Sequence, residues 1–212
     1  MKSFVKASLY IVISCLFALA GRPALADGVS YTLDPNHTQV QFNWSHLGFS
    51  HPGADFDTIS GTLIWDATDI AHSSVSVRIP VASIHTHVPA LDQKLKSAEF
   101  LDAGKFPEIR FISTKVEPVG SNHFRVTGNL TVHGVTRPAI LDVTLNRSGM
   151  YPMLNVPALG FDASTVLKRS EFGVSEGIPF VGDDIRVRIT SEALEAKGYA
   201  RAMKALSASP KQ

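Results

Sequence analysis

The chain has 212 residues, of which 44% are hydrophobic and 18% are charged. This composition excludes a disordered tail and supplies enough apolar side chains for a sizeable core. The net charge is +1 and no basic run occurs, so the sequence gives no indication of a nucleic-acid partner.

The first 26 residues have the pattern of a secretory signal peptide. Lys2 and Lys6 form a basic start, residues 7–20 are apolar, and residues 24–26 form a small-x-small cleavage site. The apolar run is too short for a good membrane span. We expect cleavage after Ala26 and, because the leader looks bacterial, a periplasmic location. Lipoprotein processing at Cys15 stays open as a second interpretation.

Removal of this leader changes two properties of the chain. Arg22 leaves with Lys2 and Lys6, so 17 basic and 19 acidic residues remain, a net charge of −2. This balance argues against an anionic membrane surface as the main partner. Cys15 is the only cysteine, so the mature chain cannot form a disulfide or a thiolate metal site. Such a domain relies on its hydrophobic core.

Residues 31–35 begin a series of short runs that alternate apolar with polar side chains, which is the period of a β-strand. Turn formers separate the runs. The expected strands lie at residues 31–35, 39–44, 55–65, 74–81, 106–116, 124–132, 138–146, 160–166 and 185–189.

Two of these runs form the clearest local motif, an antiparallel hairpin. The segment Gly128–Pro138 joins them, and residues 133–137 between the strands contain a single glycine. A proline can open the second strand but cannot donate from its middle. The hairpin has one apolar face, which must pack against another part of the chain.

Residues 89–101 have a different period, with Leu91, Leu95 and Ala98 at helical spacing. Pro89 can start this helix and Gly104 can help to end it. Residues 150–159, which contain two prolines, and residues 173–182 are expected loops. The tail 195–212 is expected to be a short helix or disordered.

About eight strands and one internal helix exclude a parallel sheet, which needs a crossover helix for each strand. An immunoglobulin-type sandwich takes about 100 residues. A closed or nearly closed antiparallel β-barrel fits better. We therefore expect one all-β domain over residues 27–194, with one short helical segment near residues 89–101.

Alternation places a set of apolar side chains inside this barrel, and Gly61 and Gly128 would leave space among them. A barrel of this size either fills with side chains or holds one slender ligand. Burial of a five-carbon isoprene unit at ~0.8 kcal/mol per methylene contributes roughly 3 kcal/mol before ordering costs. The predicted interior residues are Phe42, Trp44, Leu63, Trp65, Val75, Val77, Phe111, Leu130, Leu141, Val143 and Val187.

From about Tyr31 to Leu194, the sequence resembles the YceI-like family of bacterial secreted lipid-binding proteins. Its most specific match is Gly128–Pro138. The other matching segments are Leu33–Phe42, Ser45–Gly48, Ser73–Val75, Ser83–Ile84, Leu95–Phe100, Phe106–Phe111, Ser113–Thr114 and Arg169–Gly173. The resemblance implies an extended, lipocalin-like barrel whose apolar pore holds a polyisoprenoid or similar long-chain amphiphile. It implies no catalysis and no cofactor.

His133, Thr136 and Arg137 cluster at the central turn, and Arg169 is a further basic candidate. One interpretation is stabilisation of the turn, with Arg137 capping carbonyls or pairing with a carboxylate. The other is a polar rim for a ligand head group, because an arginine forks well onto phosphate.

The favoured prediction is a periplasmic, monomeric or dimeric carrier of an isoprenoid-type lipid. Tryptophan at Val77 or Val143 is expected to fill the pore and block uptake. One alternative is a cupin-like metal enzyme that uses His85, His87 and His133. Another is a packed barrel without a cavity, acting as a stress or interaction protein.

Overall fold

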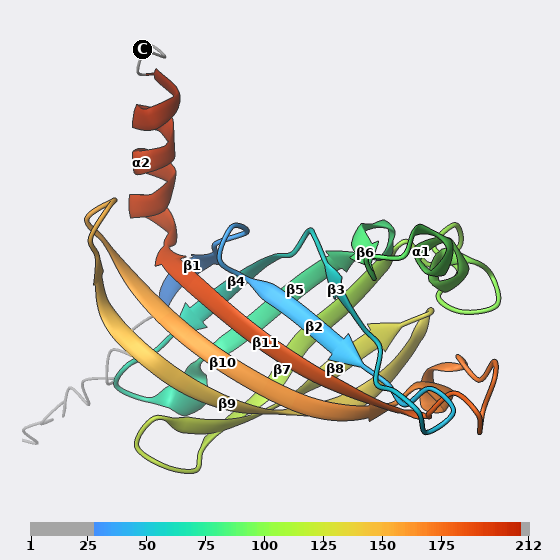
Figure 1. Ribbon diagram of the computed structural model, residues 1–212. Helices are drawn as coiled ribbons and strands as arrows, with labels where there is room; N and C mark the ends of the chain where they lie inside the picture. The colour runs from blue at the N-terminus through green and yellow to red at the C-terminus, as the bar shows by residue number, and fades with distance from the viewer. Residues whose placement is uncertain (1–27, 209–212) are drawn as a thin grey trace, which may run out of the picture.

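The computed structural model describes residues 28–208, and it contains a closed antiparallel β-barrel (Figure 1). Eight strands form the ring in the order β1-β4-β5-β7-β8-β9-β10-β11, and β11 closes it by pairing with β1. The expected all-β barrel is therefore confirmed. The ring strands are β1 Val29–Leu33, β4 Ser60–Trp65, β5 Ser74–Pro80, β7 Glu108–Pro118, β8 His123–Val132, β9 Val135–Tyr151, β10 Val156–Lys168 and β11 Asp184–Glu195.

Three further strands form a branch of the sheet: β2 Gln39–Asn43, β3 Gly53–Phe56 and β6 Ile84–His85. The long strand β11 pairs with β1 near its end and with β2 nearer its start. The predicted single strand at residues 55–65 is wrong, because β3 belongs to this branch and β4 to the ring.

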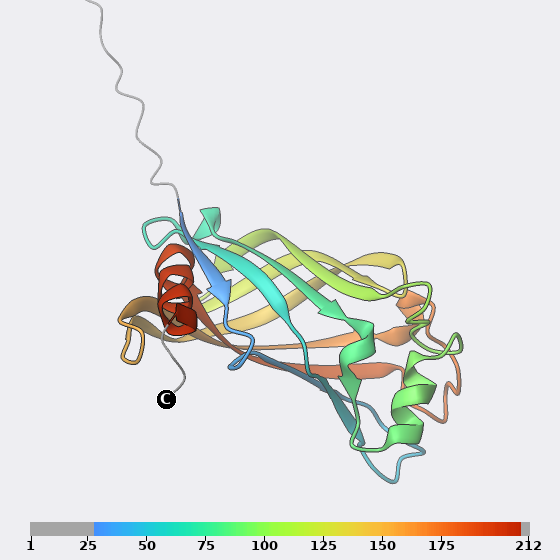
Figure 2. The ribbon, with the colours of Figure 1, turned by 90° about the horizontal axis from the view of Figure 1, so that it is seen from above.

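The helices lie at opposite ends of the barrel (Figures 1 and 2). The α1 helix, Pro89–Lys96, and the 3-10 turn η3, Arg169–Phe172, lie at one end, while α2, Ala196–Ala208, projects from the other. The predicted helical segment is present, and Pro89 occupies the first turn of α1. The helix ends before Ser97, whose N–H and hydroxyl both donate to the Lys94 carbonyl, so Gly104 does not end it.

The predicted central hairpin is present as β8 and β9. Its turn consists of His133 and Gly134, which have φ values of 51° and 73°. Two consecutive residues with positive φ are typical of the turn that matches the twist of a hairpin.

The predicted loop at residues 150–159 is wrong. Strand β9 continues to Tyr151 and β10 begins at Val156, so only four residues form the turn. Pro152 lies in that turn, and Pro157 is the second residue of β10, so neither proline interrupts a strand at its middle.

The glycines expected to leave interior space instead accommodate neighbouring side chains. A Cβ atom on Gly61 would lie 2.7 Å from Leu33 Cδ1, and a Cβ atom on Gly128 would collide with the Phe111 ring. Leu33 and Phe111 thus occupy the room that these glycines provide.

One half of the barrel, which we call the packed half, contains two clusters of buried side chains. Trp65 joins the clusters, because its ring meets Phe124 and Phe161 edge-on at centroid distances of 5.8 Å. The buried members are Tyr31, Leu33, Leu63, Leu159, Ala193, Val116, Phe124 and Val126, together with Phe111 and Ala139, which lie at the border with the cavity described below. Within residues 28–208, no helix combines the length and the apolar composition that crossing a membrane requires.

Candidate ligand-binding cavity

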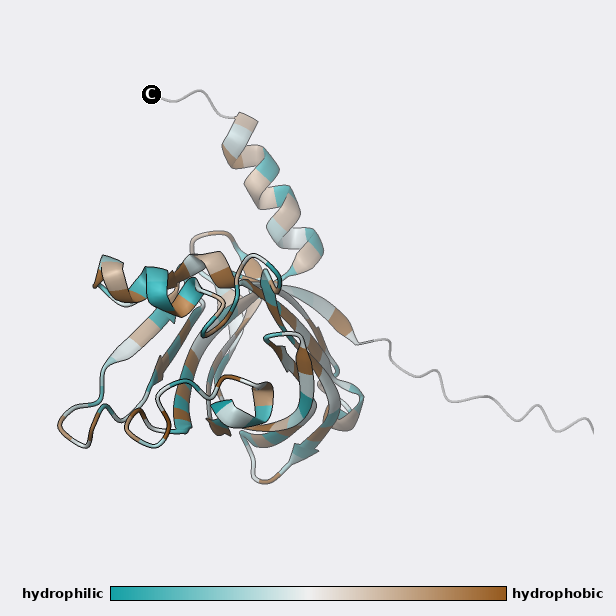
Figure 3. Cartoon of the chain, turned by 90° about the vertical axis from the view of Figure 1, so that its right-hand side faces the viewer, coloured by the Kyte–Doolittle hydropathy of each residue, from teal (hydrophilic) through white to brown (hydrophobic). Residues whose placement is uncertain are grey.

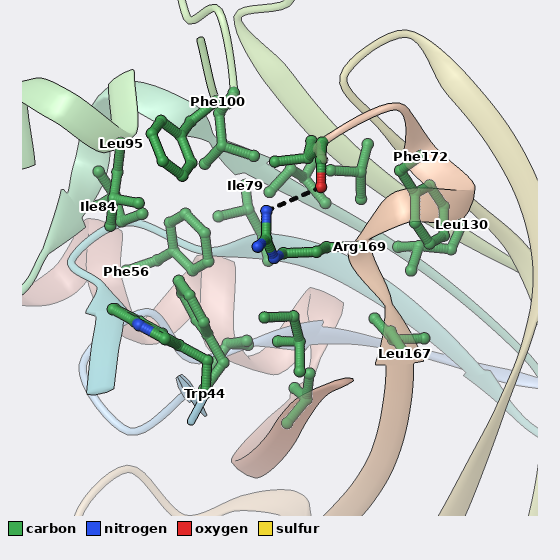
Figure 4. Close-up of a pocket in the computed structure, with 18 of the residues that line it drawn as sticks. Trp44, Phe56, Ile79, Ile84, Leu95, Phe100, Leu130, Leu167, Arg169 and Phe172 are labelled. Atoms are coloured by element: carbon green, nitrogen blue, oxygen red, sulfur yellow. Dashed lines mark hydrogen bonds between the residues drawn. The ribbon is translucent and has the colours of Figure 1, made fainter. Parts of the chain in front are cut away.

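The other half of the barrel, at the end of α1 and η3, encloses a cavity of about 600 Å³ (Figure 4). We call it the hollow half. Thirty residues line the cavity, and 25 of them are apolar. Volume and lining are typical of a small-molecule site, in which a few polar groups orient an apolar ligand. The polar lining residues are His46, Ser50, Lys94, Thr165 and Arg169.

Cross-strand pairs build the cavity wall. Val187 lies opposite Phe42, and Ile189 lies opposite Val40, where β11 pairs with β2. Phe111 continues the wall on β7, between Val77 on β5 and Leu130 on β8. Because side chains alternate along a strand, these residues share the inner face. Val187 and Ile189 are only half-buried because they face a void.

The α1 helix contributes to the end of the cavity. Leu91 and Leu95, one turn apart, line it together with Phe100 and Leu101 from the turns that follow. Figure 3 views the barrel from this end, with α1 at one side of the strands and the loops around η3 in front of them.

Hydrogen bonds between Thr86 and Asp92 fix α1 to the barrel. The Thr86 N–H and hydroxyl donate to Asp92 Oδ1 at 2.7 and 2.5 Å. The bond from the hydroxyl is the largest cause of the lowered pKa of Asp92. The carboxylate stays ionised and holds the start of α1.

Arg169 is a buried cation on the cavity lining. Its Nε, Nη1 and Nη2 atoms donate to the carbonyls of Gly182, Val174 and Val181 at 2.9–3.0 Å. Burial lowers the pKa of its guanidinium, although Asp183 and Glu176 oppose this shift. Figure 4 shows the side chain extending among the apolar lining residues.

Arg169 has donor capacity beyond these three bonds, because a guanidinium carries five N–H groups. Among the described residues, no carboxylate lies close enough to form an ion pair with it. The cavity therefore contains a positive charge whose direct partners are neutral carbonyls.

Asp183, next to this loop, anchors η3. Its two carboxylate oxygens accept from the Ser170 N–H and hydroxyl at 2.9 and 2.8 Å. Burial acts to raise the pKa of Asp183, but the hydrogen bonds from Ser170 and the charges of Lys168 and Arg169 together outweigh it, so the pKa lies below its usual value. This anchor positions the adjoining Arg169.

Seven of the eleven predicted interior residues line the cavity, and four do not. Leu63, Trp65, Val75 and Val143 belong to the clusters of the packed half. The seven lining residues are Phe42, Trp44, Val77, Phe111, Leu130, Leu141 and Val187.

Of the predicted rim residues, only Arg169 lines the cavity. His133 Nδ1 lies 3.2 Å from the Phe172 carbonyl, and Arg137 Nε donates to the Glu171 carbonyl at 3.3 Å. Thr136 pairs with the hydroxyl of Thr131 across the hairpin. These contacts favour the interpretation that the three side chains stabilise the turn, with His133 and Arg137 binding it to η3 and Thr136 linking the two strands of the hairpin.

Several residues that line the cavity were not predicted from the sequence. Alternation indicates an inward position for Val40, Ile109, Ile185 and Ile189, since each lies two positions from a residue that was predicted. The helical spacing marks Leu91 and Leu95. The remaining loop and branch residues, Phe56, Phe172, Val174 and Val181 among them, have no periodic signal.

The predicted histidine metal set does not form a cluster. The rings of His85 and His87 meet edge-on at 4.4 Å, but His133 packs on Phe106. Asp92, the carboxylate that follows His85 and His87 in the sequence, accepts from the Thr86 hydroxyl. Within residues 28–208, two other groups bring ligand atoms together: Asp34, His37 and Glu192, and Asp55, Asp57 and His85.

A closed antiparallel barrel with an apolar interior cavity places the protein in the lipocalin-like class of binding barrels. The sequence comparisons are more specific. The model of the YceI-like domain matches residues 31–193. A UPF0312 protein of Pseudomonas syringae pv. tomato is 34% identical over 180 residues, which cover 84% of this chain and 91% of the relative. The chain therefore belongs to the YceI-like family.

Solved structures agree on the fold. BcnA of Burkholderia cenocepacia matches with a TM-score of 0.69 at 23% identity, covering 76% of this chain and 98% of BcnA. The Campylobacter jejuni YceI protein matches with a TM-score of 0.65 at 27% identity, covering 71% and 89%. A polyisoprenoid binding domain from Saccharophagus degradans matches with a TM-score of 0.62 at 13% identity, covering 79% and 99%.

Proposed function

We propose that this protein binds a long-chain amphiphile of the polyisoprenoid type in the cavity and carries it, chemically unchanged, in the periplasm. The observation that carries the proposal is the apolar cavity with one buried cation on its lining. The polyisoprenoid binding of the Saccharophagus degradans domain, which has the same fold, supports the choice of ligand class.

Burial of the ligand chain would supply most of the affinity. Each five-carbon unit moved from water into the apolar cavity contributes roughly 3 kcal/mol before ordering costs. A few such units suffice for tight binding, and no reaction with the lining residues is needed.

Arg169 is the candidate for head-group recognition. Its N–H groups not bonded to the three carbonyls would donate to an oxygen of an alcohol or a phosphate, and its charge favours the phosphate. Lys94, also on the lining, lies at the same end but is exposed and pairs with Glu99 at 3.6 Å.

The two tryptophans of the sequence permit a direct binding test, because Trp44 lines the cavity and Trp65 lies in the packed half. A Trp65→Phe variant reports from Trp44 alone, and Trp44→Phe is the matched control. We expect geranylgeraniol to produce a saturable change in the emission of Trp65→Phe and little change in that of Trp44→Phe. The absence of a saturable change in Trp65→Phe would count against a ligand in this cavity.

Extraction of the natively purified protein identifies the ligand itself. Mass spectrometry is expected to find one isoprenoid-type lipid per chain. A protein that co-purifies with no lipid and takes up no added geranylgeraniol would favour the packed-barrel alternative.

A further inference from the structure

The C-terminal helix α2 lies outside residues 31–193, the part of the chain that matches the family domain, and only its first turns contact the barrel. The Glu195 carboxylate accepts from the N–H groups of Lys197 and Gly198 at 3.2 and 2.6 Å. Gly198 packs so closely on the barrel that a Cβ atom there would lie 2.9 Å from Val156 Cγ1. From Met203 to Ala208 every residue is exposed, and Figure 1 shows the helix standing away from the strands.

A helix that extends away from the barrel needs another surface against which its apolar face can pack. Helices of about 13 residues are marginal in water unless one face packs against something. Met203 and Leu206 nevertheless leave 45% and 58% of their surface exposed. The chain thus presents apolar side chains on a helix that the barrel does not cover.

The side chains of α2 separate into two faces. At about 100° per residue, Lys197, Arg201 and Lys204 fall within one narrow arc. Tyr199, Ala202, Met203 and Leu206 fall on the opposite side, and residues 196–208 contain no carboxylate. A basic face opposite an apolar face is typical of helices that lie in the plane of a membrane interface.

We propose that α2 docks on an anionic phospholipid bilayer, with Met203 and Leu206 of its apolar face among the acyl chains and its basic face among the head groups. Charge complementarity selects this occupant. Two copies of α2 packed through their apolar faces would leave both basic faces without a partner, whereas anionic lipids attract each basic side chain. The net charge of −2 after removal of the leader does not reveal the basic face of α2, because it is a sum over all residues.

A fluorescent label on the helix tests docking directly. Cys15→Ser removes the only native cysteine, and Met203→Cys then carries an environment-sensitive NBD label. The same label at Ser175→Cys, in the exposed loop after η3 at the opposite end of the barrel, is the matched control. Because the label reports locally, binding by other parts of the chain does not imitate the signal.

We expect the label at position 203 to shift to the blue with vesicles of equimolar phosphatidylcholine and phosphatidylglycerol, and much less with phosphatidylcholine alone. High salt should reverse the shift. Replacement of Lys197, Arg201 and Lys204 by glutamine should weaken the partition about fivefold per charge, roughly 100-fold in total. The emission of Trp65 verifies that these variants keep the folded barrel.

Three results would overturn the proposal: a label at position 203 that does not respond to the mixed vesicles, equal binding by the glutamine variant, or an equal response from the label at Ser175. A label that responds to protein concentration without vesicles would identify a second copy as the occupant instead. The response of Trp44 to geranylgeraniol is measured separately, so failure of either proposal leaves the other standing.

Discussion

The packed half and the hollow half of the barrel share the strands β5 and β7–β11, yet the inward side chains of these strands meet different surroundings. Strand β11 crosses both halves. Near its end Ala193 is 0% exposed, whereas Val187 nearer its start faces the cavity. Both residues occupy inward positions of one alternating strand. The period of a strand therefore selects a face, and the neighbouring strands decide whether that face is covered.

The arrangement of β1 and β2 explains the difference. At the packed end, β1 and β4 connect β11 to β5. At the hollow end, the branch β2-β3-β6 occupies the corresponding stretch of wall. The diameter of a barrel grows with the number of its strands, so the end with three short strands in place of two has more interior to fill.

The largest expected effect is on stability. Leu159→Ala, at a site 2% exposed, should lower the free energy of unfolding by about 3 kcal/mol, because it creates a cavity in a filled core. Leu167→Ala on the same strand removes atoms that already face a void, so about 1 kcal/mol is expected. Urea unfolding measures both, and equal losses would contradict the distinction between the two halves.

Filling the hollow half should affect binding more than stability. Val187→Trp is expected to weaken geranylgeraniol binding at least tenfold, roughly 1.4 kcal/mol, measured by native mass spectrometry. Arg188→Trp, on the outer face of the same strand, should bind normally. If the two variants bind alike, the ligand does not occupy this space.

The structure separates the two tryptophan substitutions that the sequence treats alike. Val77 lines the cavity, but Val143 lies opposite Phe124 in the packed half. We expect Val143→Trp to overpack the core and to cost about 1–3 kcal/mol of stability without filling the cavity. Urea unfolding checks this; an unchanged stability would show that the packed half has spare room.

Arg169 gives the hollow half a charge that the packed clusters lack. Arg169→Met should reduce the preference for geranylgeranyl diphosphate over geranylgeraniol by about tenfold, the size of one charge-assisted hydrogen bond. Arg137→Met is the control, because it removes a cation that does not line the cavity. This variant should keep the preference. An unchanged preference in Arg169→Met would exclude it as the head-group site.

The smallest expected effect concerns His37 and Asp34, near the junction of β1 and β11. The hydrogen bond between His37 Nδ1 and Asp34 Oδ2, 2.6 Å long, raises the pKa of His37. The pair therefore stabilises the fold fully below the unfolded pKa of about 6.5. This contribution is lost as pH rises through the higher folded pKa.

Since His37 is half exposed, the contribution should be under about 1 kcal/mol. Urea unfolding of the native protein and of His37→Gln across this pH range measures it. A stability difference that grows with rising pH would contradict the assignment.

The sequence predicted much of this fold because its signals are local. The alternation on either side of residues 133–134 identified the central hairpin, and the same period identified inward faces throughout the barrel. This alternation could not give the position of a residue along the barrel axis. Val75 and Val77 lie on one face of β5, two residues apart, yet only Val77 lines the cavity.

The wrong predictions have similar causes. The prolines of residues 150–159 suggested a loop, but pairing between β9 and β10 continues as far as Tyr151 and Val156 and leaves only a short turn between them. The apparent single strand at residues 55–65 divides between the branch and the ring, which no local pattern reveals. In the same way, whole-chain net charge did not reveal the separated faces of α2.

By itself, the sequence determined most of the strands, their inward faces, the central turn and the family to which the chain belongs. Only the tertiary structure decided that one half is hollow, that α1 contributes to its end, and that three loop carbonyls surround Arg169. The physical reason is that alternation is a property of neighbouring residues. A cavity depends instead on which distant strands close the wall and on how much volume their side chains fill.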